Sequence, residues 1–120
     1  MLAVTQNDPA RAERAFRRSL DVWPTAAAWT GLGFIQGRIH GEWRTALAAF
    51  ESALELDARY AEALYHSGFA YLSLGSPDRA IERLEAADRE SPGLEKVQRA
   101  LQRARSQRPR RPAIPRSPPP

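Results

Sequence analysis

The 120-residue chain contains no cysteine and only two histidines, His40 and His66. The absence of cysteine excludes disulfide bonds and metal sites built from thiolates. The two histidines fall in different predicted segments, so no histidine cluster points to a metal site. The sequence also lacks the short motifs of zinc proteases, serine hydrolases, P-loop proteins and dinucleotide-binding proteins. We therefore predict no catalytic site, no metal and no cofactor.

Long apolar runs are also absent. No stretch approaches the ~20 apolar residues that a membrane-spanning helix needs. Residues 1–4 are too short for the apolar core of a signal peptide, and Asn7, Asp8 and Pro9 interrupt any extension. These absences predict a soluble, cytoplasmic chain, and its length allows one domain at most.

The formal net charge of +4 is distributed unevenly along the chain. Residues 1–93 hold 10 arginines against 13 acidic residues, a net charge of −3. Residues 94–120 hold 8 basic residues against Glu95 alone, a net charge of +7. This asymmetry indicates a basic contact surface or tail at the C-terminal end.

One pattern of residues recurs every 34 positions. In each copy, small residues at two positions and a bulky residue between them lie on one face of a helix, and proline follows in two of the copies. Such a fixed period predicts stacked helical repeats that bury their apolar faces against one another. The three copies are Ala12, Phe16, Ser19 and Pro24; Ala46, Phe50, Ala53 and Ala58; and Ala80, Leu84, Ala87 and Pro92.

A second pattern lies upstream of two copies, at Trp29–Gly33 and Leu64–Gly68, and it steps by 35 residues. Because the helix that follows each segment steps by 34, one extra residue is expected in the first inter-helix turn, within 38–41. The glycines at 31, 33 and 37 have the spacing of close-packing helix residues rather than of a phosphate-binding loop.

Together these patterns resemble the tetratricopeptide repeat, a 34-residue helix–turn–helix unit. The departures from the family pattern are Gln36, Ala58, Leu64, Ser67 and Leu84. The resemblance covers about residues 8–105 and rests on three copies in register. The matching residues are Trp29, Leu32, Gly33, Ala46, Phe50 and Ala53 in one copy, and Gly68, Tyr71, Ala80, Ala87 and Pro92 in the next.

The predicted fold is all-α: a helical-hairpin repeat solenoid of about two and a half repeats with a C-terminal capping helix and a disordered tail. Six helices are expected, at 8–22, 25–38, 42–56, 60–74, 77–90 and 94–106. The predicted units are a partial first repeat (1–24), two repeats (25–59 and 60–93), the capping helix (94–106) and a proline- and arginine-rich tail (107–120). The tail cannot bury a core, and its arginines do not fit the common SH3-ligand patterns.

The resemblance implies a binding surface, because the first helix of each pair lines a concave face that usually holds peptides. Carried over by position, this peptide groove has an aromatic floor and a basic rim, which suit a protein or peptide partner with apolar anchors and carboxylates. The resemblance places Thr30, Phe34, and Tyr65 or His66 where a chaperone-type carboxylate clamp would need asparagine and lysine, so no such clamp is expected. The predicted groove residues are Thr30, Phe34, Arg38, Tyr65, His66, Phe69, Ser73, Arg99 and Arg103.

The sequence also predicts where several aromatic residues lie relative to the core. Phe34 and Phe69 either floor the groove or pack between helices. Trp29 is expected in the core, Trp23 over a seam between repeats, and Trp43 exposed at a helix start, where it is a minor candidate for self-association.

The sequence favours a non-catalytic protein–protein interaction scaffold that binds a peptide in the groove. One alternative is a self-assembly module, in which a second copy (a homo-oligomer) covers Ala12, Ala15 and Phe16 of the open N-terminal helix. The other is nucleic-acid or anionic-surface binding through residues 96–116, although that segment has no aromatic residue to stack on bases.

Overall fold

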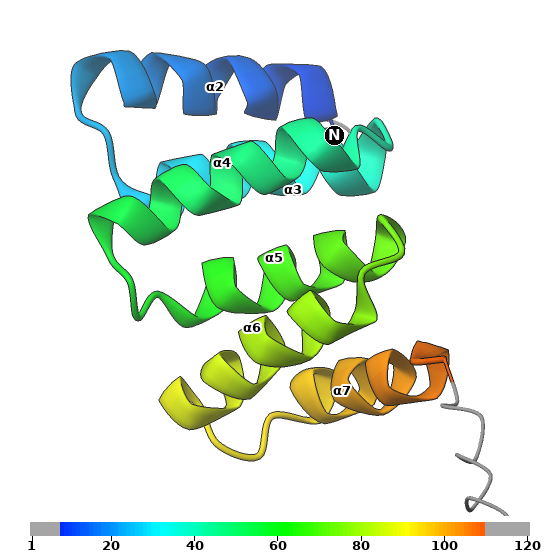
Figure 1. The fold of residues 1–120 in the computed structure, drawn as a ribbon. Helices are drawn as coiled ribbons and strands as arrows, with labels where there is room; N and C mark the ends of the chain where they lie inside the picture. Colours follow the sequence, from blue (N-terminus) through cyan, green and yellow to red (C-terminus); the bar gives the residue numbers. More distant parts are fainter. Residues whose placement is uncertain (1–7, 110–120) are drawn as a thin grey trace, which may run out of the picture.

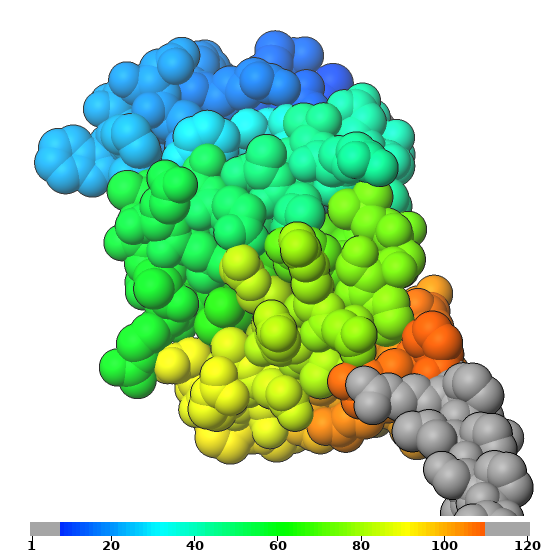
Figure 2. Space-filling view, viewed as in Figure 1, coloured from blue at the N-terminus to red at the C-terminus, as the bar shows by residue number. Residues whose placement is uncertain are grey.

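The computed structural model describes residues 8–109, and this part of the chain is a stack of α-helices with no strand. Figure 1 shows consecutive helices running back and forth across the stack, and in Figure 2 the colours follow the sequence down the stack from blue to orange. The six predicted helices are confirmed. They are α2 (Pro9–Val22), α3 (Ala26–Phe34) with its π-helical extension η1 (Ile35–Ile39), α4 (Trp43–Leu56), α5 (Ala61–Ser73), α6 (Pro77–Glu90) and α7 (Glu95–Gln107).

Local sequence signals fix where the helices begin and end. The Asp8 carboxylate accepts a hydrogen bond from the Arg11 N–H at 3.2 Å, and the Thr25 hydroxyl accepts one from the Ala28 N–H at 3.1 Å. Pro9 and Pro77 occupy first-turn positions, where a missing N–H costs nothing. Gly75 ends the turn after α5 with a φ of 79°, a left-handed conformation that favours glycine.

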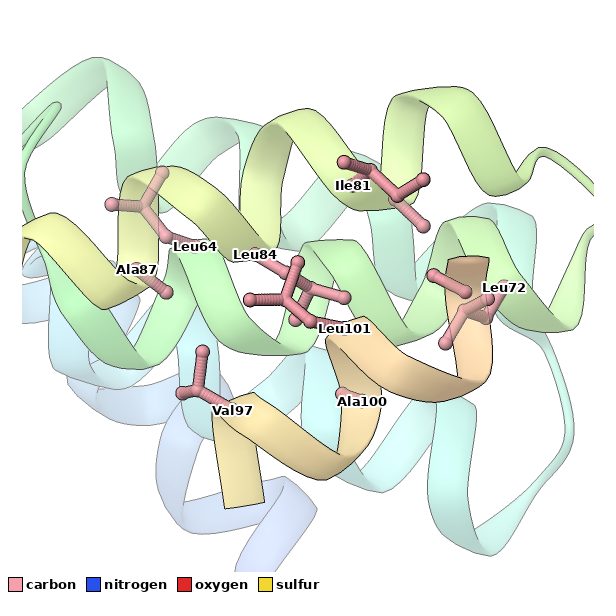
Figure 3. Close-up of a cluster of buried hydrophobic side chains, with 10 residues drawn as sticks. Leu64, Leu72, Ile81, Leu84, Ala87, Val97, Ala100 and Leu101 are labelled. Carbon is pink, nitrogen blue, oxygen red and sulfur yellow. The ribbon is translucent and has the colours of Figure 1, made fainter. Parts of the chain in front are cut away.

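The repeated residues form the core. In the two complete copies they are at most 1% exposed, whereas Ala12 and Phe16 of the first copy are only half-buried. Figure 3 shows how α7 closes the stack, with its Val97 and Leu101 packed over Leu64 and Leu84. The buried copies are Ala46, Phe50 and Ala53 on α4, and Ala80, Leu84 and Ala87 on α6.

Glycines on α3 and α5 let the two helices of each pair approach closely. A Cβ atom added at Gly33 would lie 2.5 Å from the Phe50 ring, and one added at Gly68 would lie 2.7 Å from Cγ of Leu84. The glycine of each first helix therefore makes room for the bulky residue of the second, which explains why both belong to the repeat pattern.

The extra residue of the first pair is accommodated in the π-helical turn η1, which overlaps the predicted range of 38–41 at residues 38 and 39. There the His40 N–H donates to the Ile35 carbonyl at 3.1 Å. A π turn takes in one more residue than an α turn. Gly41 then has a φ of 70° and leads into α4 just as Gly75 leads into α6.

The tryptophans depart from their predictions. Trp23 covers no seam and is 75% exposed, and Trp29 is only half-buried. Trp43 is half-buried rather than exposed, because it packs against Phe69 of α5, with ring centroids 5.5 Å apart. Trp23 follows α2 directly and Trp29 lies on α3, which packs against α2.

Residues 1–7 and 110–120 lie outside the described part of the chain, and so does most of the predicted disordered tail. Within residues 8–109, no helix is long and apolar enough to cross a bilayer.

Candidate functional site

Two hollows lie on either side of α5, on the face formed by α3, α5 and α7. The first hollow, between α3 and α5, has a volume of about 680 Å³ and is mostly apolar. It reaches the half-buried face of α2. Its lining residues are Asp8, Pro9, Ala12 and Phe16 from α2 and its cap, Ala27, Thr30, Gly31, Phe34, Ile35 and Ile39 from α3 and η1, and Tyr60, Glu62 and His66 from α5 and its cap.

The second hollow, between α5 and α7, is smaller and basic. Its volume is about 170 Å³. Aromatic residues of α5 form one wall, and basic residues of α7 form the other. The lining residues are Tyr65, Phe69, Lys96, Arg99, Ala100 and Arg103.

His66 stands at the border between the hollows, in an aromatic surrounding. Its ring centroid lies 5.0 Å from that of Tyr65 and 5.5 Å from that of Phe34. The pKa of His66 is lowered to about 4, chiefly because the ring is buried. Glu62, 3.6 Å away, opposes this shift, and the positive charges of Lys96 and Arg38 add to it. At neutral pH the floor therefore carries an uncharged imidazole.

Two cationic side chains from different helices lie over the ring of Phe69. The Arg38 Cζ lies 3.7 Å from the centre of the Phe69 ring, and the Arg103 Cζ lies 5.8 Å from it. Because Trp43 also packs on Phe69, the ring has a fixed place between η1 and α7.

The other two basic residues of this face have carboxylate partners. Lys96 lies 3.4 Å from Glu62 and 4.8 Å from the centre of the Tyr65 ring, and Arg99 pairs with Glu95 on its own helix. Within residues 8–109, neither Arg38 nor Arg103 has an acidic side chain within ion-pair distance. These two guanidinium groups are thus the ones open to an external anion.

The structure brings most of the predicted groove residues together. Thr30, Phe34 and His66 line the first hollow, and Tyr65, Phe69, Arg99 and Arg103 line the second, with Arg38 over Phe69. Thr30 is buried and its hydroxyl donates to the Ala26 carbonyl at 2.7 Å, so this hydroxyl is already used. Ser73 is exposed and lines neither hollow.

The sequence prediction omitted several lining residues from the groove, among them Ile35, Ile39, Tyr60 and Lys96. Ile35 and Ile39 are spaced i, i+4, which is a sign of a shared helix face. Lys96 lies 34 residues after Glu62, and this spacing gives the two residues equivalent repeat positions. The 34-residue period applied to Glu62 would have added Lys96, just as it relates Arg99 and Arg103 to Tyr65 and Phe69.

Nothing in residues 8–109 is arranged to hold a metal, because no three His, Asp or Glu side chains come together there. The side chains on this face can make apolar contacts, cation–π interactions and charge-assisted hydrogen bonds.

Solved structures share this fold. The first tetratricopeptide domain of Spaghetti (RPAP3), bound to the HSP90 peptide SRMEEVD, is 17% identical with a TM-score of 0.80, over 86% of this chain and 82% of that chain. The second such domain of human RPAP3, in complex with the HSP70 peptide SGPTIEEVD, is 19% identical with a TM-score of 0.76, over 85% of each chain.

The MamA protein is 26% identical with a TM-score of 0.76; the alignment covers 87% of this chain and spans 57% of the MamA chain. No curated protein sequence matches the chain. Two family models, both described as tetratricopeptide repeat, match residues 38–104 and 1–35. Because these matches cover most of its length, the chain belongs to the tetratricopeptide repeat family.

Proposed function

We propose that the chain is a non-catalytic protein-interaction module that binds a peptide segment of a partner protein on the face of α3, α5 and α7. The observation that carries this proposal is the pair of hollows flanking α5, one apolar and one basic, joined across the rings of His66 and Tyr65. Aromatic and arginine side chains contribute most strongly to binding energy at protein interfaces. Phe34 is 41% exposed and offers such a contact at the first hollow.

The structural neighbours support a peptide as the ligand, because two of them were solved with bound peptides. Those peptides both end in EEVD. In this chain Thr30 is buried and hydrogen-bonded, and Phe34 and His66 present rings rather than lysine or asparagine. We therefore expect a different ligand, in which acidic residues accompany apolar ones and no chaperone-type clamp on a terminal carboxylate is used.

Selection from a library of random 12-residue peptides displayed on phage tests the proposal directly. Selected peptides would be synthesised, and their dissociation constants measured by fluorescence anisotropy. The variants would be Phe34→Ala and Phe69→Ala, with Trp23→Ala as the control, because Trp23 is an exposed aromatic residue that lines neither hollow.

The proposal expects enriched peptides whose affinity falls at least about tenfold in Phe34→Ala or Phe69→Ala, a loss of ~1.4 kcal/mol, and stays unchanged in Trp23→Ala. A library that yields no enriched peptide would contradict it. Equal binding to all three variants and the wild type would place the interaction on another face. The EEVD peptides serve as a comparison and are expected to bind more weakly than selected ones.

The nucleic-acid alternative is weakened by the ion pairs of the C-terminal segment. Lys96, Arg99, Arg105 and Arg108 have partners in Glu62, Glu95, Glu85 and Asp78. These intramolecular pairs reduce the positive potential available to phosphates. The self-assembly alternative stays a prediction for the α2 side of the first hollow, and light-scattering mass across a concentration series tests it.

A further inference from the structure

We propose that Arg38 and Arg103, held over Phe69, form a subsite for one carboxylate side chain of the bound peptide. In this arrangement the acidic residue lies about three positions from an apolar residue whose side chain enters the first hollow. The inference rests on the proposed function and adds to it the position of the acid and the spacing of the two recognised residues.

The first argument is charge. The two guanidinium carbons are no more than about 10 Å apart, because both lie close to the centre of one ring. Two cations at this separation repel each other unless an anion joins them. Residues 1–7 and 110–120 contain no aspartate or glutamate, so no side-chain carboxylate there can serve. An acidic side chain of a bound peptide fits this pair.

The second argument is preorganisation. Phe69 is fixed by Trp43, and a guanidinium stacked on a ring keeps its N–H edges free to donate in its own plane. A carboxylate offers two oxygens at the right geometry for such donors, at about 2.7–2.9 Å. Arg38 comes from η1 and Arg103 from α7, so the subsite exists only because the repeats stack.

The third argument is the contrast between the two hollows. Asp8 and Glu62 contribute carboxylates to the first hollow, which disfavour an acid there. Basic side chains line the second hollow, which disfavours a lysine or arginine of the ligand. Charge complementarity therefore sets the orientation of the peptide: its apolar residue binds on the α3 side of α5, and its acidic residue binds on the α7 side.

The spacing follows from the distance between neighbouring helices. Packed helix axes lie about 8–10 Å apart. Since each hollow lies in the gap between two helices, a peptide that crosses α5 from one gap to the next travels about one such distance. An extended chain advances about 3.3 Å per residue. The apolar and acidic residues are therefore about three positions apart.

The test uses the full chain and a set of fluorescein-labelled 11-residue peptides of serine and glycine. Each peptide carries one tryptophan and one aspartate, separated by one, three or five positions, in both orders. A matched peptide with asparagine in place of aspartate accompanies each member. The protein variants are Arg38→Gln and Arg103→Gln. The control is Arg79→Gln, because Arg79 also lies over an aromatic ring, but over that of Tyr71, at 5.9 Å, and not over that of Phe69.

We expect the separation of three, in one of the two orders, to give the tightest binding. Replacing aspartate by asparagine in that peptide should lower its affinity about tenfold for the wild type and for Arg79→Gln. The affinity for Arg38→Gln or Arg103→Gln should hardly change. Thermal unfolding of each variant checks that the fold is kept. A conservative Arg103→Lys variant should retain part of the preference for the aspartate peptide that Arg103→Gln loses, because lysine keeps the positive charge but not the paired N–H donors.

Equal affinity for the aspartate and asparagine peptides, or equal affinity at all three separations, would overturn the subsite. Peptide binding by this face would still stand. Failure of every peptide in this set would also overturn the subsite, while the phage selection decides the proposed function separately. If Arg79→Gln lost the preference for aspartate over asparagine as fully as Arg38→Gln and Arg103→Gln, general positive charge rather than the Arg38 and Arg103 pair would attract the ligand, and the subsite would be overturned.

Discussion

The imidazole of His66 lies nearly parallel to the buried ring of Phe50, with centroids 5.7 Å apart and planes inclined by 21°. Phe50 is 1% exposed and belongs to the repeat core, whereas His66 also lines the first hollow. This stacking links the floor of the proposed binding face to the core of the second repeat. It also removes water from one face of the imidazole, so protonation of His66 acts on stability.

We predict that the protein loses stability as the pH falls from 6.5 to about 4. In the folded chain the pKa of His66 is about 4, lowered from 6.5 chiefly by burial. Between these values the unfolded state binds the extra proton, so the free energy of unfolding decreases with falling pH. The loss between pH 7 and pH 4.5 should be about 2 kcal/mol. Urea unfolding followed by circular dichroism at several pH values measures it.

The matched variant for this prediction is His66→Phe, which keeps a ring of similar shape and cannot be protonated. Glu62, Lys96 and Arg38, the charged groups that act on His66, are unchanged in it. The difference between wild type and variant thus isolates the imidazole. Parallel stability profiles for the two proteins would show that His66 does not carry the pH dependence.

Close packing at the glycines should make one substitution costly and another nearly neutral. In Gly68→Ala the new methyl would meet Cγ of Leu84 at 2.7 Å and the Ala80 carbonyl oxygen at 3.3 Å. Leu84 is fully buried and cannot withdraw. Overpacking of this kind costs about 1–3 kcal/mol, more than the roughly 1 kcal/mol that alanine gains over glycine in a helix.

Gly31→Ala is the comparison for that prediction. Its methyl would meet the far end of the Phe16 ring at 2.3 Å, but Phe16 is half-buried on α2 and can rotate away. The midpoint of thermal unfolding should fall clearly for Gly68→Ala and change little for Gly31→Ala. The opposite order would mean that α2 is held more tightly than its partial burial indicates.

Two phenylalanines should separate stability from binding. Phe50→Ala removes a fully buried ring and should lower the free energy of unfolding by about 3–5 kcal/mol. Phe34→Ala removes a ring that is 41% exposed and should change stability much less, while weakening peptide binding. Chemical unfolding of both variants is the measurement, and a large stability loss in Phe34→Ala would show that this ring serves the core instead.

The repeat architecture was predictable from the sequence because its cause is periodic. Ala46, Phe50 and Ala53 recur one repeat later as Ala80, Leu84 and Ala87, and burial of a shared face requires this recurrence. The candidate groove could be carried over by position for the same reason, since residues one period apart occupy equivalent places on neighbouring helices. Arg99 and Arg103 follow Tyr65 and Phe69 in this way.

Features that do not follow from the repeat period, such as the exposure of the tryptophans and the stacking of the arginines, were predicted wrongly or not at all. Trp23 and Trp43 are not equivalent to any repeat position, and their exposure depends on which neighbours reach them. The stacking of Arg38 and Arg103 on Phe69 depends on the rotamers of long side chains from three elements. Their sequence positions predict that the two arginines lie on the same face, but not that both guanidinium groups lie over the ring of Phe69.

The π-helical turn leads to the last prediction, which concerns deletions. Removing Ile39 should convert η1 into a regular α turn and restore the 34-residue step, because the extra residue precedes Gly41. Ile39 is also half-exposed, so little burial is lost. We expect a folded chain that loses about 1 kcal/mol. The control deletion of Ser73, at the end of the regular helix α5, shifts the turn at Gly75 and the register of α6, and should cost more than about 3 kcal/mol. Thermal unfolding of both variants decides the matter, because equal losses would place the insertion outside η1.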